Sequence, residues 1–300
     1  MSDTTDIGFL GLGQMGGAIA ERLLAKDWRL HVHDPVPSAI QRFVAAGATA
    51  HDSPASVANV ASIVFACLPN QQVSIEAAFG PRGVIHGSLL RVYVEMSTIG
   101  RETLERIALE LSSKKIETVD APVTGGPPVA RTGNLTIMVS GTRAALNAVE
   151  PMLAAVGPNI HVIGERAGMA QTMKVVNNLI MAANMIAACE GLAMGAKASL
   201  DPEMMMRVLK NGTGQSFAGC EILARAVRGT FDYGAALAVV DKDVALGLKE
   251  ASALQVTMPV IRQACGVWNA ACWAGYGDED FTAIMKVVER RNSTLIRSGT

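Results

Sequence analysis

Residues 7–24 read IGFLGLGQMGGAIAERLL: a short β-rich run, a glycine-rich turn, and a segment whose apolar residues have helical spacing. The glycines follow the pattern Gly-x-Gly-x-x-Gly. Gly11 permits a tight turn, Gly13 lets a pyrophosphate approach the backbone, and Gly16 allows close packing of helix on strand. The free N–H groups at the start of a helix attract an anion. This pattern predicts a dinucleotide-binding turn. Its expected cofactor contacts are Gly11, Leu12, Gly13, Gln14, Met15 and Gly16.

An acidic residue follows at the position expected for a ribose contact. Asp34 ends the next β-rich run, 23 residues after Gly11, and a carboxylate there accepts hydrogen bonds from ribose hydroxyls. It would also repel a 2′-phosphate, and residues 35–38 (PVPS) include no arginine to receive one. The next cation, Arg42, is expected to be mostly solvated. We therefore expect NAD rather than NADP as the cofactor. The alternative is an ordinary glycine turn with an unrelated aspartate.

The rest of the first half alternates β-rich runs with helical segments. The expected strands are residues 7–10, 30–33, 63–68, 92–96, 116–119, 135–139 and 161–163. Helical spacing of apolar residues is found between them, for example at 17–26, 38–46, 72–79 and 102–111. Because right-handed crossovers return each strand to the same end of the sheet, helices come to cover both faces. The predicted fold class is α/β, with a Rossmann-type doubly wound parallel sheet in residues 1–164.

The second half has a different character. After Gly164, methionine, alanine and leucine dominate and β-rich runs disappear, so residues 165–300 are predicted to form an all-α domain for substrate binding and oligomerisation. Residues 168–198 are expected to form one interdomain helix, roughly 45 Å long at 1.5 Å per residue. It is apolar nearly all round, and we expect a second subunit to cover part of it. Polar residues interrupt it too often for a membrane span. They are Asn177, Asn178, Asn184, Glu190 and Lys197.

The composition is that of a globular protein and argues against several functions. Of 300 residues, 50% are hydrophobic and 18% are charged, which suits two cores. The 26 basic and 27 acidic residues give a net charge of -1, too little basic charge to hold a phosphate backbone. The five cysteines form no C-x-x-C pair, which argues against a disulfide framework or a metal cluster. No leader is recognised. We expect a cytoplasmic protein with no metal, and neither nucleic acid nor a membrane as partner.

Four further motifs follow the glycine turn along the chain. They are Leu68-Pro69, residues 120–126 (DAPVTGG), residues 174–178 (KVVNN) and residues 241–243 (DKD). In order and spacing the whole set resembles the β-hydroxyacid dehydrogenase family, which includes 3-hydroxyisobutyrate, tartronate semialdehyde and hydroxybutyrate dehydrogenases. The resemblance runs nearly from end to end. It implies homodimers or homotetramers and the NAD(P)-linked interconversion of an alcohol and a carbonyl compound.

The resemblance also implies roles for the matching residues. Lys174 is then the catalytic residue, with Asn178 as its partner one helical turn on. The loop that binds the substrate carboxylate matches Thr124, Gly125 and Gly126. Cofactor contacts beyond the glycine turn are implied for Leu68, Pro69, Thr98 and Lys242.

The chemistry of the reaction supports a lysine independently. Hydride transfer to a carbonyl carbon needs a proton donor at the oxygen, and none of the five histidines follows a strand end in a suitable position. Lys174 and Asn178 are spaced i, i+4 and share a helix face. Burial makes an ammonium easier to deprotonate, so Lys174 could donate a proton in reduction and accept one in oxidation. The alternative is a surface lysine on an amphipathic helix.

Two other assignments have plain alternatives, since residues 124–126 could be a simple turn and Lys242 could belong to a solvated charge cluster. The sequence departs from the family at Thr124, where a serine is usual, and at residues 127–129 (PPV), which stiffen the rim of the loop. The loop at 211–216 (NGTGQS) is expected to face the substrate with uncharged groups.

The function expected from these observations is that of an oxidoreductase. It would interconvert a small 3-hydroxy or 4-hydroxy carboxylic acid and its semialdehyde with NAD(H), using Lys174 as general acid and base. The alternatives are an imine reductase, a group that usually lacks this lysine, and a non-catalytic nucleotide-binding sensor or scaffold.

Overall fold

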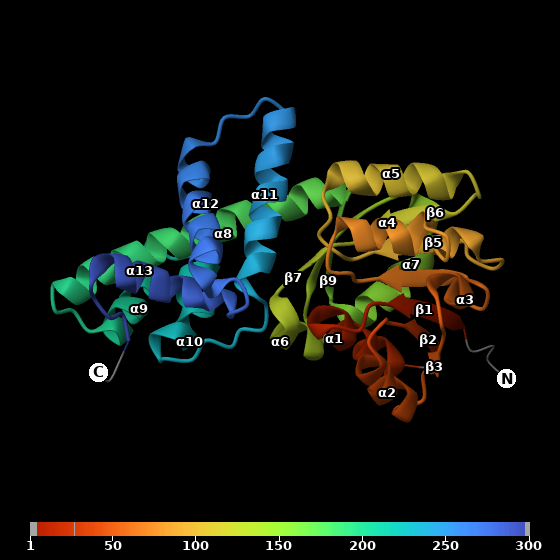
Figure 1. Cartoon of the computed structure of the whole chain (residues 1–300), viewed down its shortest axis with the longest axis horizontal. Coiled ribbons are helices and arrows are strands. Elements are labelled where there is room, and N and C mark those ends of the chain that lie inside the picture. Colours follow the sequence, from red (N-terminus) through yellow and green to blue (C-terminus); the bar gives the residue numbers. More distant parts are fainter. Residues whose placement is uncertain (1–4, 27, 298–300) are drawn as a thin grey trace. The chain divides into compact units, whose positions relative to one another are not determined.

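The computed structural model describes residues 5–26 and 28–297. The chain forms two compact units, Met1–Lys174 and Val175–Thr300, and Figure 1 shows the strands in the first and helices in the second. The sequence predicts the domain boundary between residues 164 and 165, shortly before helix α8 (Met169–Lys197) begins. The contacts divide the chain after Lys174, so the first turns of α8 belong with the sheet.

The first unit is built on one sheet. Its order is β3-β2-β1-β4-β5-β6-β8-β7, with β9 paired to β8. The pairs among β1 to β6 are parallel, and the order reverses direction between β1 and β4, where such sheets bind nucleotides. The strand bounds are β1 (Asp6–Leu10), β2 (Arg29–His33), β3 (Thr49–Ala50), β4 (Ile63–Ala66), β5 (Val92–Glu95), β6 (Glu117–Asp120), β7 (Val123–Thr124), β8 (Thr136–Ser140) and β9 (Asn159–Gly164).

One strand departs from the parallel arrangement. β8 is antiparallel to both β6 and β7, although it pairs in parallel with β9. The segment between β6 and β8 holds β7 and the short helix α6 (Gly126–Arg131). A connection of that kind allows the chain to reverse, whereas a parallel return needs a full crossover. The two-residue strands β3 and β7 are too short to show an alternating pattern in the sequence.

Helices cover both faces of the sheet (Figure 1). One core packs α1 (Gln14–Leu24), α2 (Pro37–Ala45), α6 and α7 (Arg143–Val156) on one face. The other packs α3 (Pro54–Ala58), α4 (Gln71–Phe79), the 3-10 turn η1 (Val84–His86) and α5 (Arg101–Ser112) on the opposite face.

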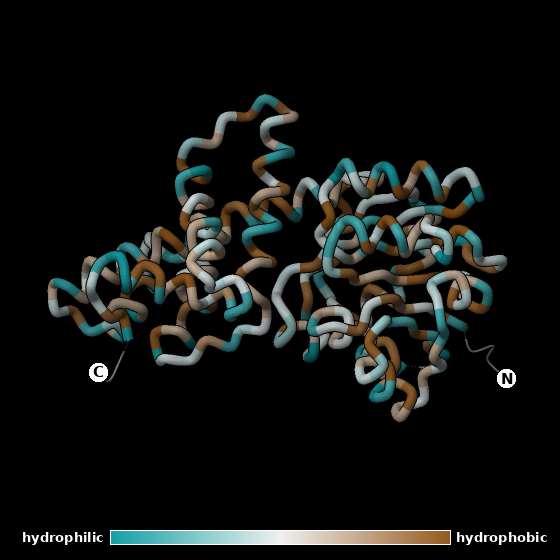
Figure 2. The backbone as a smooth tube through the Cα atoms, viewed as in Figure 1, coloured by the Kyte–Doolittle hydropathy of each residue, from teal (hydrophilic) through white to brown (hydrophobic). Residues whose placement is uncertain are grey.

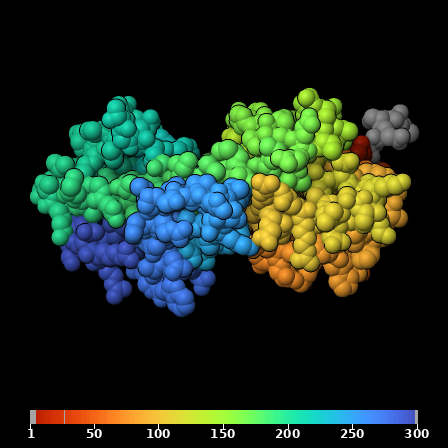
Figure 3. Space-filling model, turned by 90° about the horizontal axis from the view of Figure 1, so that it is seen from above, coloured from red at the N-terminus to blue at the C-terminus, as the bar shows by residue number. Residues whose placement is uncertain are grey.

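Successive strand residues enter opposite cores, as strand geometry requires. Phe9 and Phe65 stack in the first core and Leu10 lies in the second. Figure 2 shows these strands as apolar segments, and Figure 3 shows α5, in yellow, at the surface of the unit. The predicted doubly wound fold is confirmed.

The second unit is helical. Its core includes residues of α8 together with Trp268, which is fully buried and donates a hydrogen bond from Nε1 to the carbonyl of Ala182 at 3.2 Å. After α8 come α9 (Pro202–Asn211), η2 (Ala218–Ile222), α10 (Leu223–Val227), α11 (Leu237–Ala253), α12 (Pro259–Ala271), η3 (Cys272–Tyr276), η4 (Phe281–Ala283) and α13 (Ile284–Asn292). The predicted all-α domain is confirmed.

Helix α8 closely matches the long helix expected from the sequence. By length and mean hydropathy, 1.5 over its most apolar window, it could cross a membrane. The core helix of a globular domain passes the same test, and side chains of α8 such as Leu179, Met185 and Leu192 lie in the core of the second unit.

Candidate active site

The glycine turn lies between β1 and α1, as predicted. Gly11 has φ +87°, and a Cβ there would overlap the carbonyl oxygen of Cys67. A Cβ on Gly16 would overlap the carbonyl of Gly11. Gly13 is different, because it is exposed and a Cβ there would meet no atom within 4 Å. The chain itself therefore requires glycine at 11 and 16, while the open space at Gly13, beside the start of α1, fits an approaching pyrophosphate.

Asp34 directly follows β2 and contacts the glycine turn. Its Oδ2 accepts a hydrogen bond from the N–H of Leu12 at 2.7 Å, and its Oδ1 accepts one from the N–H of Val36 at 2.8 Å. Each carboxylate oxygen can accept more than one hydrogen bond. Asp34 thus holds the turn against the end of β2 and keeps acceptor capacity for a ribose.

Arg42 lies beside the same turn, a position that the sequence analysis missed. Its Nη2 donates to the carbonyl of Leu12 at 3.0 Å, and its Nη1 lies 3.4 Å from Glu21. The sequence gives no sign of this, because Arg42 lies in the last turn of α2 and only the tertiary fold brings its guanidinium to the turn. A cation therefore lies close to the residues that would bind the adenosine half of a cofactor.

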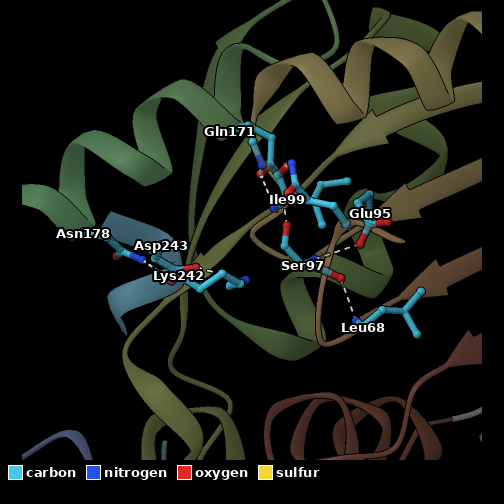
Figure 4. Close-up of polar contacts among 10 residues, drawn as sticks. Leu68, Glu95, Ser97, Ile99, Gln171, Asn178, Lys242 and Asp243 are labelled. Atoms are coloured by element: carbon cyan, nitrogen blue, oxygen red, sulfur yellow. Dashed lines mark hydrogen bonds and ion pairs between the residues drawn. The ribbon is translucent and has the colours of Figure 1, made fainter. Parts of the chain in front are cut away.

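The loops after β4 and β5 are joined by a hydrogen bond from Leu68 to Ser97 (Figure 4). The N–H of Leu68 donates to Ser97 Oγ at 2.6 Å, and the N–H of Ser97 donates to Glu95 at 3.0 Å. Leu68 and Pro69 follow β4, and Thr98 follows β5. Three residues expected at the cofactor therefore lie on two adjacent loops with a fixed spacing.

Glu95 is a fully buried carboxyl group within this connection. The hydroxyl of Tyr93 and the N–H of Ser97 donate to it. Burial raises the pKa of Glu95 from 4.5 to about 7, against the opposing effect of these hydrogen bonds. The group is therefore half protonated near neutral pH in the folded chain, but ionised there in the unfolded chain.

This shift predicts that the first unit loses stability as pH rises. Between the unfolded and folded pKa values the folded state holds the extra proton, so the free energy of unfolding decreases with pH. Glu95 alone should lower the free energy of unfolding by about 2 kcal/mol between about pH 5 and pH 8. Urea unfolding of wild type and Glu95→Gln at several pH values measures the effect. The free energy of unfolding of Glu95→Gln should fall less steeply with pH than that of wild type. The exposed control Glu76→Gln should show the wild-type dependence on pH. The same dependence in all three proteins would contradict the raised pKa of Glu95.

Lys174 lies in the second turn of α8 and is buried, with 9% of its surface exposed. The alternative of an ordinary surface lysine is therefore wrong. Burial of a cationic side chain costs free energy of folding unless its surroundings stabilise the charge or the group gives up its proton. This placement suits a proton donor.

In the second unit, Asp243 of α11 holds two of the predicted side chains (Figure 4). Asn178 Nδ2 donates to Asp243 Oδ2 at 2.7 Å, and Lys242 Nζ lies 3.1 Å from Asp243 Oδ1. Asn177 Nδ2 donates in turn to the side-chain Oδ1 of Asn178 at 3.0 Å. Asp243 is only 6% exposed, so this is not a solvated charge cluster. Asp243 is a residue whose importance the sequence analysis missed.

The predicted carboxylate loop lies between β7 and α6. Thr124 ends β7, and Gly125 and Gly126 have φ +132° and +80°. A Cβ on Gly125 would also lie 2.9 Å from Val129. The turn requires glycine at both positions whether or not a carboxylate binds. The loop at 211–216 is largely exposed between α9 and η2.

A nucleotide turn at the reversal point of a doubly wound sheet, with a buried lysine on the helix that follows the sheet, defines the chain as an NAD(P)-dependent dehydrogenase. Comparisons with known proteins agree. The family model for the NAD binding domain of 6-phosphogluconate dehydrogenase matches residues 6–164, and the model for the NAD-binding region of NADP-dependent 3-hydroxyisobutyrate dehydrogenase matches residues 168–288. The chain belongs to the β-hydroxyacid dehydrogenase family.

Individual relatives match over nearly the whole chain. The 2-(hydroxymethyl)glutarate dehydrogenase of Eubacterium barkeri is 32% identical over 301 residues, covering 100% of both chains. The mitochondrial 3-hydroxyisobutyrate dehydrogenase of Bos taurus is 30% identical, covering 98% of this chain and 89% of its own. The crystal structure of 3-hydroxyisobutyrate dehydrogenase from Salmonella typhimurium superposes with a TM-score of 0.85 at 29% identity, covering 94% of this chain and 99% of the other.

Imine reductases share the fold at lower similarity. The enzyme of Streptomyces aurantiacus has a TM-score of 0.63 and 19% identity, covering 94% of this chain and 99% of its own. Such identity supports a common fold alone. The predicted family, fold class and enzyme class are confirmed, and the dehydrogenase interpretation fits the relatives better than the imine reductase alternative.

Proposed function

We propose that the protein interconverts a small 3-hydroxy or 4-hydroxy carboxylic acid and its semialdehyde with NAD(H), and that Lys174 is the general acid and base. The burial of Lys174 at the start of α8 is the observation that carries the proposal. The names of the relatives support the substrate class, since two of them act on 3-hydroxyisobutyrate and on 2-(hydroxymethyl)glutarate.

Each residue has a definite task in this mechanism. The glycine turn holds the pyrophosphate, Asp34 accepts hydrogen bonds from the ribose, and the nicotinamide supplies or takes the hydride when the cofactor is bound. Thr124 and the amides of Gly125 and Gly126 bind the substrate carboxylate. In reduction the ammonium of Lys174 donates a proton to the carbonyl oxygen, and in oxidation its amine removes the hydroxyl proton.

A substrate panel tests this function. The full-length protein is given NAD⁺ or NADH with 3-hydroxyisobutyrate, 2-(hydroxymethyl)glutarate, 4-hydroxybutyrate, the matching semialdehydes and a cyclic imine, and NADH absorbance is followed. We expect turnover with hydroxy acids and semialdehydes. Reduction of the imine alone would support the imine reductase, and tight NADH binding without any turnover would support the sensor.

The preference for NAD is proposed to depend on Asp34. In Asp34→Ser the carboxylate that repels a 2′-phosphate is gone, and Arg42 remains beside the turn. We expect the ratio of kcat/KM for NAD to that for NADP to fall about 100-fold, which corresponds to about 3 kcal/mol. Steady-state kinetics with both cofactors measure it. Asp278→Ser, an exposed aspartate in the second unit, should leave the ratio unchanged. An unchanged ratio in Asp34→Ser would contradict the role of Asp34.

We also propose a homodimer or homotetramer. Ile180 and Met194 of α8 are 50% and 75% exposed. Large apolar side chains exposed on one helix suit burial by a second copy of the chain. Light scattering of the purified protein measures the assembly.

The cytoplasm is our proposed location, supported by the buried thiols of Cys189, Cys220 and Cys265.

A further inference from the structure

A fully buried glutamine lies three residues before Lys174. The side-chain amide of Gln171 uses its full hydrogen-bonding capacity, since two donors and two acceptor sites are all occupied. The oxygen accepts hydrogen bonds from the N–H groups of Ile99 and Gly100 at 2.9 and 3.0 Å. The nitrogen donates to the carbonyl of Ser97 at 2.9 Å (Figure 4). It also donates to Asp120 Oδ1 at 2.9 Å. One side chain therefore connects the loop after β5 to the end of β6.

The backbone of the first turn of α8 is held from the same side. Asp120 Oδ2 accepts from the N–H groups of Gly168 and Gln171 at 3.1 and 2.9 Å. Ser140 Oγ accepts from the N–H of Ala170 at 3.1 Å and donates to Asp120. The first N–H groups of a helix lack partners within the helix, and a negative charge there is favourable. The strand ends thus supply the cap of α8 and fix the position of its first turn.

These contacts form one connection from the cofactor side to the proton donor. Leu68 bonds to Ser97, the carbonyl of Ser97 bonds to Gln171, and Gln171 precedes Lys174 by about 4.5 Å of helix rise. Because one turn of a helix is stiff, a displacement of Gln171 moves Lys174 by a similar amount. Misplacement of a catalytic group by about 1 Å can cost on the order of 100-fold in rate.

We propose that Gln171 is a positioning residue, which fixes the spacing between Lys174 and the loops that carry Leu68 and Thr98. The inference rests on the proposed function of Lys174, but its structural part stands on the four hydrogen bonds of the amide. Neither the sequence motifs nor the family resemblance assigns a role to Gln171.

Gln171→Glu is the decisive variant, because glutamate has the same shape. One oxygen of the new carboxyl can still accept from Ile99 and Gly100, while the other faces two acceptors, the carbonyl of Ser97 and the carboxylate of Asp120. When both carboxyl groups are ionised they repel each other, whereas a proton held between them restores one hydrogen bond. Charged groups near the site include Lys174, three residues on in α8, Glu95 of β5, reached through Ser97, and Arg101 and Glu105 of α5, beside Gly168.

We expect kcat of Gln171→Glu to be about 100-fold below wild type at about pH 8.5 and to recover to within about tenfold at about pH 6. KM for NAD should change by less than about threefold, because the glycine turn is untouched. Gln171→Asn keeps the amide but is one methylene too short to reach both partners, so it should lose activity without recovery at low pH. Gln263→Glu, on the exposed face of α12, is the matched control and should behave as wild type.

Amide hydrogen exchange of the protein without substrate gives a second readout. At about pH 8.5, residues 97–101 and 168–174 should exchange faster in Gln171→Glu than in Gln263→Glu, and this difference should shrink at about pH 6 after correction for intrinsic rates. The proposal is overturned if kcat of Gln171→Glu is lowered equally at both pH values, or if kcat is not lowered at all. If the wild type turns over no hydroxy acid, the proposed function fails instead, and exchange alone then decides whether Gln171 holds the two segments together.

Discussion

Replacement of Lys174 by alanine should lower kcat about 1,000-fold, within the range of 10²- to 10⁴-fold that a positioned acid or base contributes. The loss should be in kcat, because the lysine acts on the reacting oxygen and lies outside the glycine turn. Binding of NADH, followed by its fluorescence, should stay within about threefold of wild type. Steady-state kinetics in both directions with the preferred hydroxy acid and semialdehyde measure the loss.

Lys197→Ala is the matched control, since Lys197 is an exposed lysine in the last turn of the same helix. It should retain wild-type kinetics. Small primary amines added to Lys174→Ala should restore part of the lost turnover, because they can enter the space left by the side chain and exchange protons there. Lys174→Ala with turnover equal to that of Lys197→Ala would remove Lys174 from the mechanism and leave only the fold and the cofactor site.

The parts of the site predicted well from the sequence are those written in consecutive residues. The glycine turn needs only a strand, a helix and three spaced glycines, so residues 11–16 were predicted with their contexts. The start of α8 follows from Gly168, which has φ +93°, and from the long apolar run behind it. Lys174 was assigned from a local motif and lies buried as the assignment requires.

The residues that were missed act across long separations in sequence. Gln171 bonds to Asp120 across 51 positions, and Asn178 bonds to Asp243 across 65. In the sequence Gln171 and Asp243 are polar residues whose partners lie far along the chain, and each is equally consistent with a solvated face. The position of Arg42 beside Leu12 and the antiparallel direction of β8 have the same origin, since only tertiary packing decides them. The signal for Gln171 in the sequence is its place near the start of a helix expected to be buried, where a polar side chain needs a hydrogen-bond partner.

Gly13→Ala should separate cofactor binding from folding at the glycine turn. A Cβ at position 13 meets no protein atom within 4 Å, and the backbone there, at φ -65°, is open to any residue. The added methyl would instead occupy the space through which the pyrophosphate approaches. We expect the affinity for NADH to fall about 100-fold, or about 3 kcal/mol, with a Tm within about 2 °C of wild type. Fluorescence titration and thermal unfolding measure the two quantities on the same samples.

Gly16→Ala provides the opposite case. Its Cβ would overlap the carbonyl of Gly11 within the turn itself, so the variant should unfold at a lower temperature even before cofactor is added, by several degrees for a loss of about 2 kcal/mol. The two glycines of one motif are therefore required for different reasons, contact with a ligand at Gly13 and contact within the chain at Gly16. Equal losses of stability in the two variants would show that the space at Gly13 is closed in solution, and wild-type NADH affinity in Gly13→Ala would mean that the pyrophosphate binds elsewhere.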